Sequence, residues 1–176
     1  MSLMPHKRQI TLLKTNGFKA YFSTQFLGAL NDNFFKNSLT LGIIYTLSTH
    51  SQNQNLLLIN IAAALFILPF LIFSPIAGQL AQNTEKSTYI QRIKLVEIFI
   101  MMMGAVLYVY QQIYGLLFIL FLMGTQSAFF GPVKYSILPL MLKPRDLYQA
   151  NALVEAGTFI AILGGLFLSA FIFNIN

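Results

Sequence analysis

The stretch FLGALNDNFFKNSLTLGIIY, Phe26 to Tyr45, decides the fold because it is apolar enough to cross a membrane and yet carries two charges. Asp32 and Lys36 would each cost about 2.5 to 3.5 kcal/mol at the centre of a bilayer, so such residues normally face a protein interior or a water-filled cavity. They lie four residues apart and therefore share one face of a helix. We predict that this face borders a transport pathway. The alternative is an ion pair that only stabilises the helix.

The composition indicates an all-α polytopic membrane protein. Of 176 residues, 56% are hydrophobic and 9% are charged, against about 25% charged in ordinary soluble domains. Eleven lysines and arginines outnumber five acidic residues, but they are scattered over short loops rather than gathered on one basic face, so we expect no nucleic-acid partner. The chain has no cysteine and only two well-separated histidines, and we expect neither a metal nor another cofactor.

Hydropathy divides the chain into a basic cytoplasmic segment at residues 1–19 and a partial transmembrane domain at residues 20–176. Five spans are predicted at about residues 20–47, 56–80, 95–110, 115–142 and 147–173. The segment 82–94, between the second and third spans, is expected to be a charged loop. We expect Lys94 and Glu97 to lie at the cytoplasmic boundary, where the lysine can extend toward water.

The distribution of basic residues predicts the orientation. Cytoplasmic loops of membrane proteins carry an excess of lysine and arginine. Nine of the eleven basic residues fall in the amino-terminal segment, the second loop or the fourth loop: Lys7, Arg8, Lys14, Lys19, Lys86, Arg92, Lys94, Lys143 and Arg145. We therefore expect the amino terminus to be cytoplasmic and Asn176 to lie on the opposite side. The two basic residues left inside spans are Lys36 and Lys134.

Lys134 and Glu155 are predicted to lie at matching depth on consecutive helices. At about 1.5 Å per residue, Lys134 is roughly 10 Å and Glu155 about 12 Å from the cytoplasmic ends of their spans. Because an unpaired buried charge is strongly unfavourable, we hypothesise that Lys134 neutralises Glu155 or Asp32, or alternates between them. The alternatives are a lysine that extends to the cytoplasmic surface and a glutamate that serves only helix packing.

Amides and small residues add two further expectations. Asn33 and Gln126 are candidate substrate- or ion-binding residues, and the alternative is that they form interhelical hydrogen bonds worth about 0.6 kcal/mol each. In the fifth span, small residues recur every fourth position, at Gly157, Ala161, Gly165 and Ser169. Such a stripe lets two membrane helices approach closely. We expect its partner to be a sixth helix outside this chain.

The arrangement of spans and loops resembles the first half of a major facilitator superfamily transporter. The loop GQLAQNTEKS, Gly78 to Ser87, resembles the signature GxLaDrxGrR of that superfamily. It departs from the signature at two points, because Gln82 replaces the aspartate and Lys86 alone remains of the basic pair. The departure puts the usual charge-relay gate at this loop in doubt.

Three motifs in order are similar to the lysophospholipid transporter family of that superfamily: QFLGALNDNFFKNSL (25–39), FFGPVKYSILP (129–139) and ANALVEAGTFIAILGG (150–165). The resemblance implies a carrier of the bacterial inner membrane that moves lysophosphatidylethanolamine-type lipids to the cytoplasmic leaflet for reacylation. It also implies an acyltransferase and acyl-carrier-protein synthetase encoded alongside or fused. On this resemblance, Lys134 would bind the lipid phosphate, and Asp32 a cationic head group or a coupling ion.

The resemblance also implies a longer protein. Transporters of this superfamily have twelve helices and hold substrate between two halves, so we expect the five predicted spans to be the amino-terminal part of such a carrier. A carrier for another amphiphile or solute, or a truncated fragment without transport activity, remains open. An enzyme is not expected, because the chain has no cysteine and no histidine in a span, and Asn55 stands where an acyltransferase pattern beginning at His50 needs an aspartate.

Overall fold

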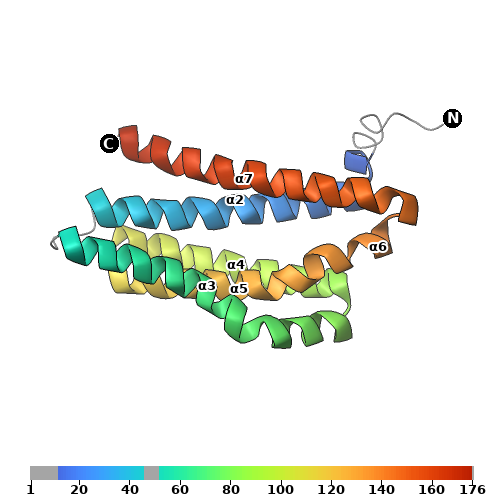
Figure 1. Ribbon diagram of the computed structural model, residues 1–176, viewed down its shortest axis with the longest axis horizontal. Coiled ribbons are helices and arrows are strands. Elements are labelled where there is room, and N and C mark those ends of the chain that lie inside the picture. The colour runs from blue at the N-terminus through green and yellow to red at the C-terminus, as the bar shows by residue number, and fades with distance from the viewer. Residues whose placement is uncertain (1–11, 46–51, 176) are drawn as a thin grey trace.

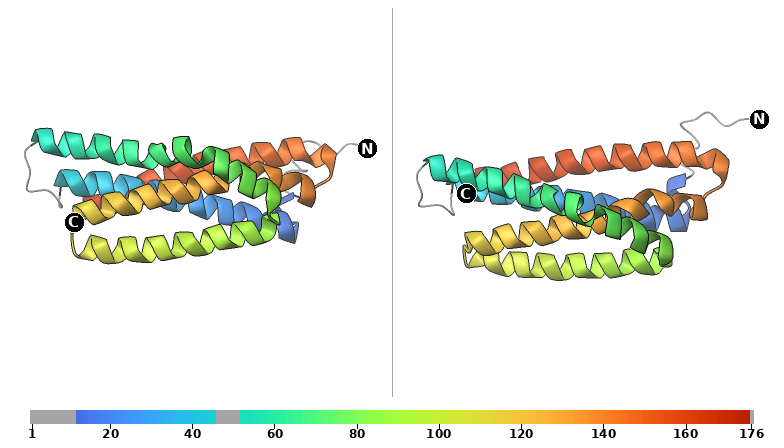
Figure 2. Two further views of the ribbon diagram at one scale, coloured as in Figure 1. Left: turned by 90° about the horizontal axis from the view of Figure 1, so that it is seen from below. Right: turned by 60° about the horizontal axis from the view of Figure 1, so that its bottom comes forward.

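The computed structural model describes residues 12–45 and 52–175, which are almost entirely helical and contain no strand. Five long helices run side by side along the long axis of the molecule (Figures 1 and 2). They are α2 (Asn16–Tyr45), α3 (Gln52–Asn83), α4 (Lys86–Val109), α5 (Ile113–Ser136) and α7 (Leu147–Ile175), with the short α6 (Leu138–Met141) and a 3₁₀ turn η1 (Pro144–Asp146) before α7. The prediction of an all-α protein is confirmed.

Length and composition identify a membrane protein. Three helical segments among the described residues are long and apolar enough to cross a bilayer: Gln52–Asn83, Ile113–Ser136 and Pro144–Phe173. Large apolar side chains also cover the outside of the bundle, such as Leu71, Phe159 and Phe167. The helices α2 and α4 are of similar length, at 30 and 24 residues, but carry the charged residues discussed below. That all five helices cross the membrane therefore stays a prediction.

Small residues allow the helices to pack closely in two places. A methyl group at Gly165 of α7 would lie 2.7 Å from the carbonyl oxygen of Leu30 and 2.7 Å from the backbone nitrogen of Phe34, both on α2. A methyl group at Gly124 of α5 would meet the backbone carbonyl of Phe66 on α3. The small-residue stripe of α7 thus faces α2. The expectation of a sixth helix as its partner is wrong, because α2 already occupies that face.

The prediction of a charged loop at residues 82–94 is also wrong. Only Thr84 and Glu85 separate α3 from α4. The Glu85 carboxylate accepts hydrogen bonds from the backbone N–H groups of Ser87 (2.9 Å) and Thr88 (2.6 Å), which caps the helix. Hydrogen bonds from Thr88 and Ser87 also hold the pKa of Glu85 below its usual value. Because this cap starts α4 at once, the helix begins at Lys86 rather than near residue 95.

The predicted fourth span, 115–142, is interrupted near its carboxyl-terminal end. The helix α5 ends at Ser136, and α6 begins at Leu138. Pro139 has no backbone N–H, so the carbonyl four residues before it cannot make the usual helical hydrogen bond. In contrast, Pro69 and Pro75 lie inside α3, which bends along its length without ending (Figure 1).

The apolar core falls into two clusters at opposite ends of the bundle. One contains Phe18 and Leu138 and lies where α2 and α7 begin. The other contains Leu39 and Leu120 and lies toward the far end of α2 and the start of α5. Between the two clusters, near the midpoints of α2, α4 and α5, a layer of polar side chains lies inside the bundle. This layer contains Asp32, Ser127 and three further residues described next.

Candidate functional site

A continuous set of hydrogen bonds crosses the middle of the bundle from α4 through α5 to α2. Lys94 Nζ lies 2.5 Å from Glu97 Oε2, and Gln126 Nε2 donates to the same oxygen at 2.5 Å. Ser127 Oγ lies 3.0 Å from Gln126 Oε1 and 2.6 Å from Asp32 Oδ2. We call these five residues the central polar chain. It joins three helices at a depth where an isolated charge would be costly.

Lys94 points into the bundle rather than toward water. Its side chain is 18% exposed and that of Glu97 is 11% exposed. A β-carbon at Gly28 of α2 would collide with Nζ of Lys94, so the missing side chain at this position makes room for the ammonium group. Nζ also lies 4.6 Å from the centre of the Phe130 ring. The expectation that Lys94 extends toward water is therefore wrong, whereas the position of Lys94 and Glu97 relative to the membrane boundary stays a prediction.

Asp32 is paired differently from what its sequence neighbours predict. Its Oδ2 contacts Ser127, whereas its Oδ1 is buried and has no hydrogen-bond partner among the described residues. Lys36 instead donates to Asn33 Oδ1 at 3.3 Å and lies 5.4 Å from the centre of the Phe66 ring. The Asp32–Lys36 ion pair that was open as an alternative does not form in the described chain. The central polar chain holds two carboxylates and one lysine.

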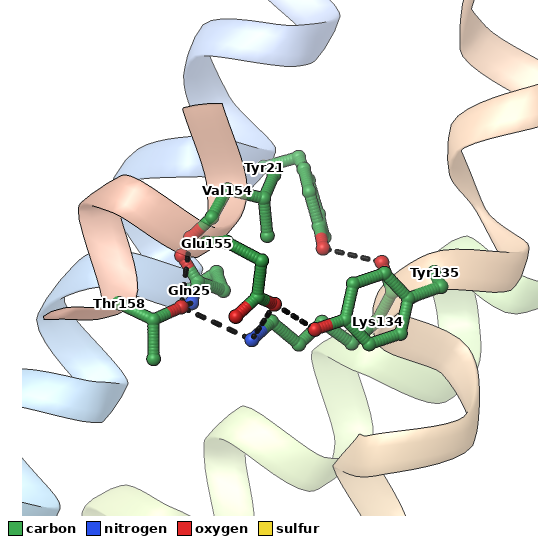
Figure 3. A network of polar contacts seen from close by, with 7 residues as sticks. All are labelled: Tyr21, Gln25, Lys134, Tyr135, Val154, Glu155 and Thr158. Atoms are coloured by element: carbon green, nitrogen blue, oxygen red, sulfur yellow. Dashed lines mark hydrogen bonds and ion pairs between the residues drawn. The ribbon is translucent and has the colours of Figure 1, made fainter. Parts of the chain in front are cut away.

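A second polar group, which we call the lysine cluster, lies between α2, α5 and α7 (Figure 3). Its members are Lys134, Glu155, Thr158, Gln25 and Tyr135. Lys134 Nζ is 3.3 Å from Glu155 Oε1 and 3.0 Å from Thr158 Oγ1. Gln25 of α2 donates to the same threonine oxygen at 2.6 Å. The Tyr135 hydroxyl donates to Glu155. The predicted contact between Lys134 and Glu155 is therefore present, while the other proposed partner of Lys134, Asp32, belongs to the central polar chain.

The members of the lysine cluster differ in exposure. The Lys134 side chain is 14% exposed and that of Glu155 is 44% exposed. The Tyr21 hydroxyl donates to the Lys134 backbone carbonyl, which ties α2 to α5 behind the lysine. An ammonium group can bind an anionic group such as a phosphate through charge-assisted hydrogen bonds.

The two polar groups are stacked along the same helix faces. Gln25 and Asp32 are seven residues apart on α2, and Ser127 and Lys134 are seven residues apart on α5. Two helical turns return to the same face with a rise of about 10 Å. Lys134 and the carboxylate of Asp32 therefore lie roughly 10 Å apart along the bundle axis.

The structure places the six predicted site residues in three settings. Lys134 and Glu155 meet in the lysine cluster, and Asp32 and Gln126 belong to the central polar chain. Lys36 donates a hydrogen bond to Asn33, and neither side chain belongs to the lysine cluster or the central polar chain. The Asn33 amide nitrogen donates to the backbone oxygen of Ala29 at 2.8 Å, which is a bond within its own helix rather than between helices.

Sequence reasoning missed Lys94, Glu97, Ser127 and Thr158 as members of these groups. One signal was available, because Lys94 and Glu97 are three residues apart at the start of an apolar run and can pair on one helix face. No comparable signal marks Ser127 or Thr158, since a hydroxyl in a membrane helix commonly bonds to its own backbone.

Comparisons with known proteins point to one group of transporters. The lysophospholipid transporter LplT of Photorhabdus laumondii is 30% identical over 170 residues, which cover 93% of this chain and 38% of the relative. Proteins of the same name from Escherichia fergusonii and Cronobacter sakazakii are each 29% identical, over 88% and 87% of this chain and 36% of each relative. The chain thus spans little more than a third of the length of these curated relatives. No family model and no solved structure matches it.

Proposed function

We propose that this chain forms part of a lysophospholipid transporter, in which the lysine cluster and the central polar chain line the path of the lipid head group. The observation that carries the proposal is the coincidence of two findings. Curated relatives over about nine-tenths of the chain are lysophospholipid transporters, and the bundle has a polar layer where a packed membrane protein would otherwise be apolar.

The proposed roles follow from the charges of a zwitterionic lipid such as lysophosphatidylethanolamine. Lys134 would bind the phosphate, because its ammonium group is positively charged and its side chain keeps some exposure, at 14%. Asp32 would attract the cationic end of the head group or a coupling cation, because its Oδ1 lacks a hydrogen bond and the central polar chain has one more carboxylate than lysines. Gln126 and Ser127 would hold Asp32 in place.

Uptake of labelled lysophosphatidylethanolamine by spheroplasts tests this function. Spheroplasts that express the gene encoding this chain should accumulate the lipid faster than spheroplasts without the gene. Glycerophosphoethanolamine, which has the same head group and no acyl chain, should not be taken up faster. Equal lipid uptake with and without the gene would reject the proposal, whereas gene-dependent uptake of glycerophosphoethanolamine would indicate a carrier for polar solutes.

We further propose that the protein resides in the bacterial inner membrane with its amino terminus in the cytoplasm. In support, the basic residues Lys19, Lys86, Lys143 and Arg145 lie at the end of the bundle where α2 and α7 begin and α3 ends. In this orientation the carrier would deliver lysophospholipid to the cytoplasmic leaflet. The family resemblance suggests that an acyltransferase, encoded alongside or fused, would then reacylate it.

Single cysteines should confirm this orientation, because the chain contains no native cysteine. Ser87 is exposed at the start of α4, and Gln112 is exposed in the turn between α4 and α5. In spheroplasts, a maleimide that cannot cross membranes should label the Gln112→Cys variant, whereas the Ser87→Cys variant should be labelled only after the membrane is opened. Labelling of both variants in closed spheroplasts would contradict the topology.

A further inference from the structure

A groove between α3, α4 and α5 lies on the outside of the bundle, near its basic end. Its volume is about 430 Å³, and apolar side chains make up most of its lining. Arg92 is the only charged residue among the described residues that line it, and Thr84 and Tyr89 lie at the same end. The residues of the lysine cluster do not line this groove, and of the central polar chain only Gln126 does.

The shape of the groove matches one hydrocarbon chain. Its floor is formed by buried residues such as Ile93 and Ile100, and its edges by half-exposed residues such as Leu80 and Val96. From Arg92 to Ile100 the groove extends along α4 for about 12 Å. This length is close to half of the roughly 30 Å hydrocarbon thickness of a bilayer. A single acyl chain from one leaflet would therefore fill it.

The charge at the mouth of the groove favours an anionic head group. Arg92 is exposed and makes no ion pair with any described residue. It lies about 9 Å along α4 from Lys86, on the side of the bundle that carries the other basic residues. Its long side chain can extend from there to the polar head groups of the same leaflet. An arginine presents several donors in a planar fork, which suits phosphate oxygens.

We propose that this groove binds one anionic phospholipid of the leaflet at the basic end, with an acyl chain between α3, α4 and α5 and the phosphate on Arg92. This lipid is a resident ligand and not the transported one, and the proposal does not depend on the transport function. Basic pockets between membrane helices bind anionic lipid head groups in this way.

Tryptophan fluorescence tests the proposal, because the chain contains no native tryptophan. The probe variant is Val96→Trp, at the edge of the groove. The control is Leu95→Trp, which is one residue away on α4, similarly exposed and outside the groove. The purified protein is placed in phosphatidylcholine vesicles that contain a small fraction of phosphatidylglycerol brominated on its acyl chains. Bromines quench a tryptophan only when the lipid lies beside it.

Brominated phosphatidylglycerol should bind at Val96→Trp about fivefold more tightly than brominated phosphatidylcholine, since one basic residue near the surface favours an anionic lipid by about this factor. Leu95→Trp should show no preference. In the Val96→Trp background, Arg92→Gln should abolish the preference and Arg92→Lys should keep most of it. No preference at Val96→Trp would overturn the proposal, as would a preference that survives Arg92→Gln.

A second measurement needs no tryptophan in the groove and therefore covers the case in which the indole itself occupies the site. Native mass spectrometry of the otherwise unmodified protein should show one retained phosphatidylglycerol molecule. The Arg92→Gln variant should lose it, and the Lys19→Gln variant, which removes a basic residue from the same end of the bundle but not from the groove, should retain it. If both variants retained the lipid equally, its binding would depend on the overall positive charge of that end of the bundle and not on Arg92. The proposed site in the groove would then be rejected.

Discussion

Uptake of lysophosphatidylethanolamine is expected to fall about tenfold or more when Lys134 is replaced by methionine. The substitution keeps the length of the side chain and removes its charge. Lys134 Nζ contacts both Glu155 and Thr158, so the variant loses the ammonium group that we propose for the phosphate. One hydrogen bond to a charged group is worth about 1.5 to 3 kcal/mol, and tenfold in rate corresponds to the lower end of that range.

Two further variants separate recognition of the lipid from folding. Lys134→Met leaves Glu155 without its cation, so Lys134→Met with Glu155→Gln should recover stability but not uptake. Lys36→Met is the matched control, because Lys36 contacts Asn33 and the Phe66 ring rather than a carboxylate, and uptake should stay within about twofold of the unmodified rate. If Lys134→Met transported the lipid at the normal rate, Lys134 would have no part in binding the phosphate.

A large loss of stability is expected for Gly165→Ala. The added methyl group would lie 2.7 Å from two backbone atoms of α2, at Leu30 and Phe34. Backbone atoms cannot rotate away as a side chain can, so α7 must shift away from α2. We expect a cost of about 3 kcal/mol, at the upper end of the usual range for overpacking. The measurement is the thermal unfolding midpoint of the detergent-solubilised protein.

Gly164→Ala provides the control on the neighbouring residue. Its methyl group would lie 3.5 Å from a side-chain carbon of Leu30, which is ordinary van der Waals contact. The two substitutions add the same atom to the same helix, and they differ only in the direction of the new group. Equal unfolding midpoints for the two variants would show that α2 and α7 do not approach as closely as described.

The sequence predicted the class of fold, and its five predicted spans correspond to five long helices among the described residues, because both depend on local properties. Apolar runs and the charged residues between them identify membrane helices without knowledge of how they pack. The ends of the helices were less predictable. Glu85 begins α4 through its own carboxylate, and a glutamate within a charged segment gives no clear signal for a cap.

The sequence predicted the contact between Lys134 and Glu155, since both lie at one depth on consecutive helices. It did not predict the partners of Asp32. Those partners depend on which face of α5 turns toward α2, and this rotation is fixed by contacts such as that of Gly124 with α3. Likewise, Lys94 can enter the bundle only because Gly28 on another helix leaves space for it. The spacing of residues along one helix shows neither the rotation of α5 nor the space that Gly28 leaves for Lys94.

The most direct test of the central claim, that the protein recognises the phosphate of a lysophospholipid, is competition during uptake of labelled lysophosphatidylethanolamine. Unlabelled lysophosphatidylglycerol, which has the phosphate and a different head group, and monoacylglycerol, which has no phosphate, are compared at equal concentrations. We predict that lysophosphatidylglycerol inhibits uptake by the unmodified protein and that monoacylglycerol does not. Equal inhibition by the two lipids would contradict the account, because recognition would then depend on the acyl chain alone.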